Sequence, residues 1–198
     1  MPAMTTTLPT SQEINSFLSS IRTCDSPIHL ETLTPDSIKA LYEIGSKPGI
    51  WTFARYKKES HESFKKYFDK VLARKDSVNF AIREAKSDKV IGFTRLKAID
   101  LLKSRSEIGT WIIQEYQGKG FNYFIKKELL SVAFLLLKLD RIYSLINIDN
   151  VPSIKSLTRL GFKNEKNKNK DGMTESGKSI KLVYYYYDSA QFSDDYLT

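Results

Sequence analysis

The chain has 198 residues, of which 41% are hydrophobic and 27% are charged, and its formal net charge at pH 7 is +8. This length and composition are typical of one globular domain with its own core, and no stretch approaches the roughly 20 apolar residues of a membrane span. A single cysteine, Cys24, excludes an internal disulfide and indicates a reducing compartment, so we expect a cytoplasmic protein.

The excess of positive charge favours a polyanionic partner, which can be a nucleic acid, an acidic membrane or a phosphate-bearing cofactor. Charge alone does not choose among these three. His29 and His61 lie far apart in the sequence, with no cysteine or paired carboxylates at ligand spacing, so we predict no metal site. The first residues lack a cationic segment followed by a hydrophobic one, so we expect no secretory signal.

Composition divides the chain into three parts. Residues 1–26 are rich in Ser, Thr and Pro, and we interpret them as an N-terminal extension that is partly ordered at best. We expect a single domain over 27–190 and a C-terminal tail over 191–198.

The first half of the domain begins with a predicted strand at 28–33. Thr34 and Pro35 then form a helix start, an N-cap followed by proline at the first helical position, which predicts a helix over about 35–45. Apolar residues at helical spacing predict a second helix over 61–76.

Three predicted strands follow the two helices, at 77–85, 89–99 and 106–113. The first two are joined by the short polar turn Lys86-Ser87-Asp88, and the connection to the third strand is also short. Consecutive strands with short connections are typical of an antiparallel meander.

The second half of the chain contains its strongest predicted helix, over 121–138, which is apolar nearly all round in its second half and should therefore be buried. A strand at 141–148, a short helix at 151–160 and a lysine-rich hairpin at 162–187 complete the order. This order predicts an α+β domain in which three antiparallel strands lead into a strand–helix–strand crossover.

The loop between the third strand and the long helix reads QEYQGKGFN, residues 114–122. Gly118 and Gly120 permit positive φ and leave the backbone open, and the helix start offers unpaired N–H groups to a pyrophosphate, with Lys119 as an added cation. An ordinary surface turn explains the two glycines equally well. The patterns of a P-loop and of a Rossmann fingerprint are both absent.

Three stretches together settle this choice: EIGTWIIQEYQGKGFNYF, the following AFLLLKLDRIYSLINIDNVPSIKSLTRLGFKNE, and the closing aromatic strand. Over about residues 28–188 the chain resembles the GNAT superfamily of N-acetyltransferases, and within it the branch that acetylates the N-terminal alanine or serine of ribosomal proteins. The resemblance implies a three-layer α/β/α fold with a mixed, mostly antiparallel sheet that is splayed at strands 4 and 5. It also implies acetyl-CoA-dependent transfer to a primary amine by direct attack in a ternary complex.

The family's acetyl-CoA signature, Q/R-x-x-G-x-G/A, corresponds to Gln117, Gly120 and Asn122, so that Asn122 stands where a small residue is usual. The resemblance further implies a bulge in strand 106–113, whose free backbone groups would pair with the pantetheine arm. The implied cofactor-binding residues are Trp111, Ile112, Ile113, Gln117, Gly118, Lys119, Gly120, Phe121, Asn122, Asn150 and Ser153.

Glu107 is the candidate general base, because this branch often carries a glutamate on the strand that leads to the splay. Ser153, in the pattern N-x-x-S with Asn150, is the candidate side chain beside the sulfur. Many members carry a tyrosine general acid four residues after this serine, where this chain has Leu157. Tyr143 and Tyr187 are substitutes without support from a motif, and Arg141 and Phe162 are expected to be structural, with Phe162 under the final hairpin.

Two other functions stay open at this point. The charge run KNEKNKNKDG, at 163–172, fits a basic RNA-binding module, and the missing tyrosine fits a GNAT-like protein that binds CoA without catalysis. For an enzyme, the partner is an amine: the resemblance favours a protein N-terminus or a ribosomal protein, and polyamines, aminoglycosides and amino acids remain candidates. We expect no membrane partner, no nucleic acid as the primary partner, and a monomer or a homodimer.

Overall fold

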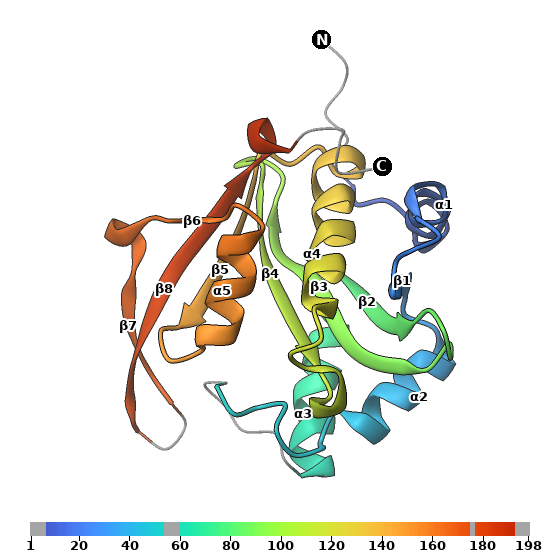
Figure 1. Ribbon diagram of the computed structural model, residues 1–198, viewed down its shortest axis with the longest axis horizontal. Helices are drawn as coiled ribbons and strands as arrows, with labels where there is room; N and C mark the ends of the chain where they lie inside the picture. Colours follow the sequence, from blue (N-terminus) through green and yellow to red (C-terminus); the bar gives the residue numbers. More distant parts are fainter. Residues whose placement is uncertain (1–6, 54–59, 175–176, 193–198) are drawn as a thin grey trace.

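The computed structural model describes residues 7–53, 60–174 and 177–192, and its framework is a twisted eight-stranded sheet (Figure 1). The strands run in the order β1-β2-β3-β4-β5-β8-β6, and β7 also pairs with β8. The strands are β1 (Ile28–Thr32), β2 (Ser77–Glu84), β3 (Val90–Asp100), β4 (Arg105–Ile112), β5 (Arg141–Asn147), β6 (Lys163–Asn164), β7 (Lys170–Met173) and β8 (Ser179–Asp188). The helices are α1 (Ser11–Ile21), α2 (Pro35–Ile44), α3 (His61–Leu72), α4 (Phe121–Ser131) and α5 (Val151–Arg159).

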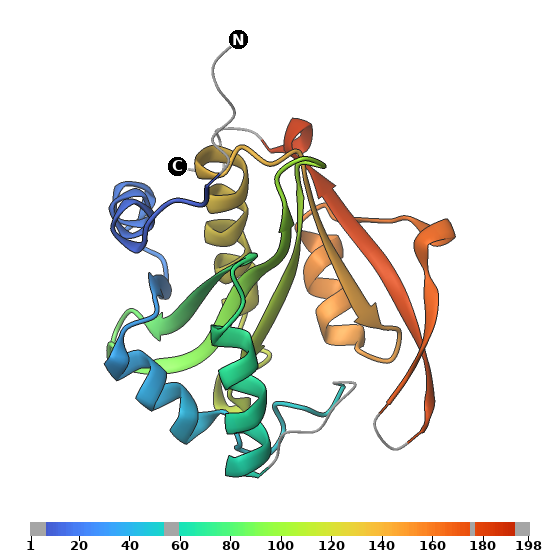
Figure 2. The same cartoon turned by 180° about the vertical axis from the view of Figure 1, so that it is seen from behind.

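Helices cover both faces of the sheet, as the predicted three-layer α+β fold requires (Figures 1 and 2). One core cluster joins α1, α4 and α5 to one face, with Ile125 and Leu157 fully buried in it. A second, aromatic cluster lies under α2 and α3 on the other face and includes Phe64, Phe68 and Trp111. Side chains of a strand alternate between faces, so the same strands supply both clusters.

The α2 and α3 helices begin where the sequence predicts. Thr34 and Ser60 are their N-caps, and each accepts a hydrogen bond from the backbone N–H three residues later. The α2 helix ends at Ile44, as predicted, whereas α3 ends at Leu72, before its predicted end at 76.

The predicted meander is confirmed: β2, β3 and β4 pair antiparallel, and β1 adds to the edge of β2. The predicted bulge in 106–113 is wrong. The β3–β4 register runs without a shift from Gly92 opposite Ile112 to Lys97 opposite Glu107, and the irregularity lies beyond it, where Ala98 has a φ of 49°.

The sheet is splayed between β4 and β5, as predicted. These two strands pair in parallel only at their beginnings, from Arg105 opposite Arg141 to Glu107 opposite Tyr143. Beyond that point β5 pairs with β8 alone, as far as Asn147 opposite Leu182. The second half of β4 therefore has an unpaired edge that faces β5 across a gap.

The long helix differs from its prediction at the C-terminal end. The α-helical part, α4, ends at Ser131, and a π-helical turn, η2, continues over Val132–Leu136. The Leu137 N–H donates to the Val132 carbonyl, five residues back, so the helix widens before it ends at Lys138, which has a φ of 54°.

Part of the segment assigned to the N-terminal extension belongs to the packed domain. Within 7–26, α1 starts with a capping box between Thr10 and Glu13, and its Ile14 and Leu18 are each 3% exposed in the main core. The Asn15 side chain also bonds Thr32 of β1, at 2.8 and 3.0 Å. Helical spacing of apolar residues in EINSFLSSI was the signal for this contact.

Candidate functional site

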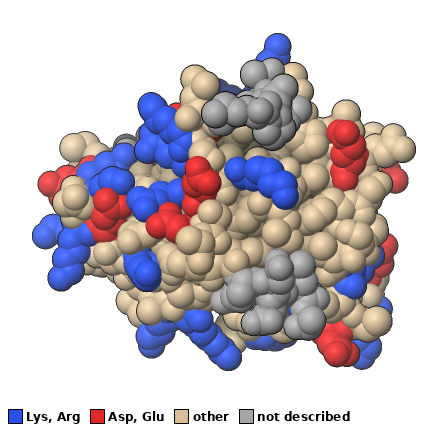
Figure 3. Space-filling model, turned by 90° about the horizontal axis from the view of Figure 1, so that it is seen from above, with Lys and Arg blue, Asp and Glu red and all other residues tan. Residues whose placement is uncertain are grey.

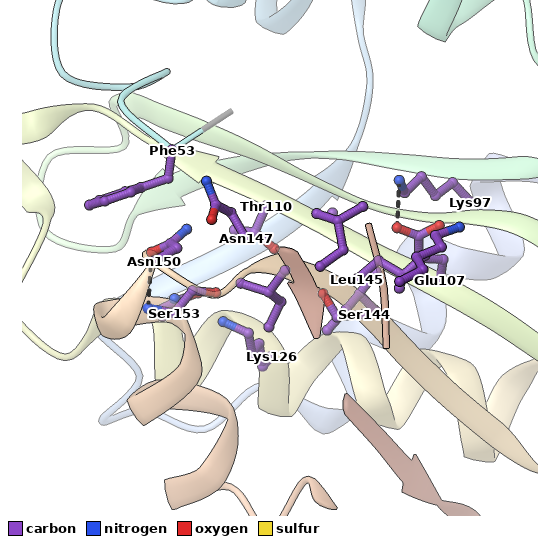
Figure 4. Close-up of a pocket in the computed structure, with 16 residues that line it drawn as sticks. Phe53, Lys97, Glu107, Thr110, Lys126, Ser144, Leu145, Asn147, Asn150 and Ser153 are labelled. Atoms are coloured by element: carbon purple, nitrogen blue, oxygen red, sulfur yellow. Dashed lines mark hydrogen bonds and ion pairs between the residues drawn. The ribbon is translucent and has the colours of Figure 1, made fainter. Parts of the chain in front are cut away.

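The gap between β4 and β5 opens into a cleft of about 440 Å³ (Figure 4), a volume within the range of small-molecule sites. Its walls come from β4 and β5 at the sides and from α4 and α5 beneath. The described lining residues are Phe53, Lys97, Glu107, Ile108, Gly109, Thr110, Asn122, Lys126, Ser144, Leu145, Ile146, Asn147, Asn150, Ser153, Lys170 and Leu182.

The glycine loop lies at the start of α4, and its backbone is open. Gly118 and Gly120 have φ of 74° and 83°, and a Cβ built on either would meet nothing within 4 Å. Gly120 is the N-cap of α4 and offers no side chain to the first N–H groups of the helix. Open amides at the positive end of a helix dipole form a ready site for an anion.

The residues around these glycines support the loop from one side. The Gln117 side-chain amide donates to the Ile112 carbonyl at 2.9 Å, which ties the loop to the end of β4. Lys119 Nζ lies 5.5 Å from the centre of the Tyr116 ring, and the Phe121 ring packs edge-on against the same tyrosine. Lys119 itself is exposed, so its charge is available at the loop.

Asn122 and Lys126 face the cleft from one side of α4, one helical turn apart. Within the described chain, Asn122 Oδ1 is buried and has no hydrogen-bond partner. Lys126 is only 4% exposed, and burial lowers the pKa of its ammonium group to about 7. Lys126 was not predicted as a site residue, although its spacing of four residues from Asn122 was a signal that both share a helix face.

The backbone at 111–113 is presented differently from the prediction. The Ile113 N–H donates to the Ile91 carbonyl at 3.0 Å, so Ile113 is engaged by β3. Backbone groups of alternate residues point to opposite edges of a strand, which turns Trp111 toward β3 as well. Thr110 and Ile112 therefore turn their backbone groups toward the gap, where the Ile112 carbonyl already accepts from the Gln117 amide. The Trp111 side chain is buried in the aromatic cluster.

Glu107 lies in the cleft but is not isolated. Its carboxylate forms an ion pair with Lys97 Nζ at 2.8 Å, and the two side chains are 17% and 27% exposed. The cation compensates the charge of the carboxylate, so the pair presents little net field to a ligand.

Asn150 and Ser153 meet at the start of α5. Asn150 is the N-cap, and its side-chain oxygen accepts the Ser153 N–H at 3.2 Å. This is the local capping role that asparagine fills in many helices. Both residues also line the cleft, opposite Thr110 (Figure 4).

Neither substitute tyrosine lies among the residues that line the cleft. The Tyr187 hydroxyl donates to the Gln191 carbonyl at 2.9 Å, and its ring packs against Phe134 and Phe162. Tyr143 stacks on Tyr184, with ring centres 5.1 Å apart. Burial and then the charge of Glu107 raise the pKa of Tyr143. Leu157 is fully buried in the core.

The two residues expected to be structural both lie in packed or paired positions. Arg141 pairs with Asp188 at 2.6 Å and with Glu165 at 3.3 Å, and its guanidinium lies 4.2 Å from the centre of the Tyr186 ring. Phe162 is 3% exposed and packs on Tyr187 of β8.

The lysine-rich hairpin does not form an uninterrupted basic patch. Figure 3, whose left side corresponds to the β6–β8 side of Figure 1, shows Lys and Arg side chains mixed with Asp and Glu. Lys168, for example, pairs with Glu165 at 3.1 Å. Pairing of this kind weakens the field that would attract a polyanion.

The described residues contain no group of three or more His, Cys, Asp or Glu side chains that could hold a metal ion. Among the same residues, no helix is long and apolar enough to cross a membrane.

Comparisons with known proteins agree with this geometry. The chain is 34% identical to the provisionally named ribosomal N-acetyltransferase YdaF of Bacillus subtilis over 94 residues, which is 48% of this chain and 51% of that protein, so it spans about half the length of this relative. It is 23% identical to a spermidine N(1)-acetyltransferase of Vibrio cholerae over 144 residues, 71% of this chain and 82% of that one.

Among solved structures, the spermidine N-acetyltransferase of Vibrio cholerae in complex with CoA and spermine has a TM-score of 0.72. The two share 20% sequence identity, and the match covers 88% of this chain and all of that chain (100%), a likeness of fold. The family model of the acetyltransferase (GNAT) domain matches residues 28–163, well over half of the chain. The chain therefore belongs to the GNAT acetyltransferase family.

Proposed function

We propose that this protein is an acetyl-CoA-dependent N-acetyltransferase that moves an acetyl group to a primary amine in a ternary complex. The observation that carries the proposal is the continuity of the site: the open glycine loop at the start of α4 leads into the cleft between β4 and β5. An elongated ligand with a diphosphate at one end and an acyl group at the other fits such an arrangement.

Several features of the cleft suit acetyl-CoA, which supplies the acetyl group as an activated thioester. The amides at Gly118–Asn122 would hold the diphosphate, with the Lys119 cation beside them. The backbone N–H and C=O of Thr110 and the N–H of Ile112 would pair with the amide-containing pantetheine arm as a neighbouring strand does, while the Ile112 carbonyl accepts from Gln117. Asn122 Oδ1, which has no partner in the described structure, offers an acceptor to an N–H of that arm.

Asn150 and Ser153 would contact the arm from the opposite wall, at the start of α5. The Asn150 carbonyl oxygen is used by the cap, so its amide N–H₂ is the group left for a ligand. The Ser153 hydroxyl and the N-terminal end of α5 would together stabilise negative charge on the departing sulfur.

Glu107 would act on the acceptor amine, either by taking its proton through water or by orienting its ammonium form. The ion pair with Lys97 weakens this carboxylate as an attractor of cations. An acceptor that is already partly neutral near pH 7 places the smallest demand on such a base. A protein α-amino group, with an ordinary pKa of about 7.7–8.0, meets this condition better than a lysine or polyamine amine near 10.

The charge of the cleft also favours a protein N-terminus over a polyamine. Among the described lining residues, Glu107 is the one carboxylate, whereas Lys97, Lys126 and Lys170 are basic. A polyamine carries several positive charges and needs several carboxylates around it. The described lining of the cleft supplies one, Glu107. A protein with a free N-terminus is the acceptor that fits both arguments, and the name of the YdaF relative suggests a ribosomal protein.

Cofactor binding is tested by thermal unfolding with CoA, acetyl-CoA or an equal concentration of RNA. A ligand at about 100 times its Kd adds about 2.7 kcal/mol to the stability of the folded state. We expect both CoA ligands to raise the Tm and RNA to leave it unchanged. A shift with RNA alone would replace the enzyme by a basic RNA-binding module.

Acceptor class is tested by release of free CoA thiol with three substrates: a peptide with a free N-terminus, the same peptide with its N-terminus blocked and a lysine present, and spermidine. We expect turnover with the first peptide to exceed that with the other two. Faster turnover of spermidine would make the protein a polyamine acetyltransferase, and CoA binding without any turnover would make it a non-catalytic CoA-binding protein.

A further inference from the structure

The cleft contains an amine that the proposed reaction does not use. Lys126 extends from α4 into the space between β4 and β5, on the side of Ser153 (Figure 4). We infer that Lys126 is a self-acetylation site, at which the protein transfers an acetyl group from its own bound acetyl-CoA to its own side chain. The inference rests on the proposed function, because it needs acetyl-CoA in this cleft.

The surroundings of Lys126 are unusual for a lysine. It is 4% exposed, and among the described residues its Nζ has no hydrogen-bond or ion-pair partner. The charged residues that share the cleft are Lys97 and Glu107, which pair with each other, and Lys170 from β7. Lysine is rarely buried without a partner, so an unpaired one in a cleft points to a chemical role.

Burial also changes the state of this amine. With a pKa of about 7, about half of the Lys126 side chains are neutral at pH 7, whereas a lysine with an ordinary pKa near 10.4 is neutral in roughly one molecule in 2,500. Only the neutral amine has the lone pair that attacks a carbonyl. Lower basicity reduces the intrinsic reactivity of the nitrogen, so the gain in rate is smaller than this difference in neutral fraction.

Position favours the reaction as well. Lys126 lies one turn beyond Asn122 on the face of α4 that lines the cleft, and the side chains of helical residues lean back toward the N-terminus. Lys126 therefore lines the same cleft as Glu107, where the acceptor would bind, one turn beyond the start of α4, where the diphosphate would bind. An acyl chain held in the gap must pass beside it, and such proximity replaces a bimolecular encounter.

The chemical step balances without another reactant. The lone pair of Lys126 Nζ attacks the thioester carbonyl carbon, an N–C bond forms, and the C–S bond breaks. CoA leaves as a thiolate and takes up the proton that the nitrogen loses, so the products are acetyl-lysine and CoA thiol. An amide is a poor acyl donor, so each molecule would keep the group once it is acetylated.

The test is incubation of the full-length protein with acetyl-CoA and no acceptor, followed by peptide mass spectrometry that separates Lys126 from Lys127. Lys127 is the internal control, because it lies on the same helix but outside the lining of the cleft. We expect Lys126 to be acetylated at least about tenfold faster than Lys127. The rate per molecule should not depend on protein concentration, and excess CoA should suppress it.

Two variants make the result specific. Lys126→Met nearly keeps the length of the side chain and removes the amine, so it should abolish the fast acetylation assigned to Lys126. Lys127→Met should leave that fast acetylation intact. The Tm shift with CoA is measured in parallel. If CoA binds and free amines are acetylated while Lys126 stays unmodified, self-acetylation is refuted and the proposed function stands. If CoA does not bind, both proposals fail together.

Discussion

The ammonium group of Lys97 lies 2.8 Å from the carboxylate of Glu107, at the end of the cleft where β4 and β5 begin to separate. The two residues are directly opposite each other on β3 and β4, so their contact is fixed by the register of the sheet. The candidate base is therefore held by a cation of the protein, and an acceptor amine has to compete with that cation for it.

Substitution of Glu107 by glutamine separates binding from catalysis. The change keeps the size of the side chain and removes its charge, so we expect CoA affinity to stay unchanged and kcat to fall by about 10- to 100-fold at neutral pH. Single-turnover acetylation of a peptide, beside CoA titration calorimetry, measures both. Equal turnover in the variant would remove Glu107 from the mechanism.

Lys97→Met tests the other half of the pair. Without its cation, the Glu107 carboxylate is free to attract an ammonium group, so we expect a lower KM for cationic amines, by about 3- to 10-fold. Neutral acceptors should show a smaller effect. A higher KM would mean that Lys97 itself contacts the acceptor.

Gly120→Glu tests the glycine loop, and Gly177→Glu is its matched control. Both glycines have positive φ, of 83° and 79°, and a Cβ on either meets nothing within 4 Å. The backbone strain should therefore be similar, about 1–2 kcal/mol in each variant. Only Gly120 lies at the start of α4, where a carboxylate would repel the diphosphate of CoA. We expect titration calorimetry to show no CoA binding for Gly120→Glu and unchanged binding for Gly177→Glu.

The sequence predicted the order of the elements well because each has a local signal. The helix start at Thr34 and Pro35 is a local hydrogen-bond pattern, and the strands at 77–85 and 89–99 are joined by a turn that is visible in the sequence. The glycine loop was predicted for a similar reason, because the ability of Gly118 and Gly120 to adopt a positive φ depends on residue type and not on distant contacts.

The errors concern contacts between distant segments. The Lys97–Glu107 pair depends on the register of two strands, and the engagement of Ile113 by Ile91 depends on which edge of β4 faces β3. Burial of Lys126 depends on the splay of the sheet above α4. None of these follows from residue type or from spacing within one element.

Glu128 offers a test of buried charge on the opposite side of α4 from the cleft. Its carboxylate accepts the Leu30 N–H at 3.0 Å, and burial raises its pKa to about 7. In the unfolded chain this pKa is about 4.3, so between pH 4.3 and 7 the folded state binds more protons than the unfolded state. Stability contributed by the protonated form is complete below pH 4.3 and is lost as the pH rises toward 7.

Glutamine at position 128 keeps an acceptor for Leu30 and cannot ionise. We therefore expect Glu128→Gln to raise the free energy of unfolding by about 1–3 kcal/mol at pH 8 and to change it little at pH 4. Urea unfolding at the two pH values measures this, with the exposed Glu115→Gln as control. A gain of equal size at both pH values would show that the pKa of Glu128 is the same in the folded and unfolded states, so that burial does not raise it.

Lys126 should give the opposite pH dependence. Burial lowers its pKa to about 7 in the folded state, whereas the unfolded chain keeps a value near 10.4. Between these values the unfolded state holds a proton that the folded state lacks, so stability rises with pH across the window from 7 to 10.4. Below pH 7 both states carry the charge, and the folded state has the full cost of burying it.

Lys126→Met removes this cost and leaves an apolar side chain of similar length in the cleft. We expect the variant to be more stable than the parent by about 1–4 kcal/mol at pH 6, and the difference to shrink toward zero by about pH 10. Urea unfolding of protein freed of acetyl-CoA measures it, with Lys127→Met as the neighbouring control. Because Glu128 is unchanged in both proteins, its own titration cancels in the difference. A gain that stays constant from pH 6 to pH 10 would mean that burial does not lower the pKa of Lys126, and an amine that stays protonated has no lone pair for an acyl group.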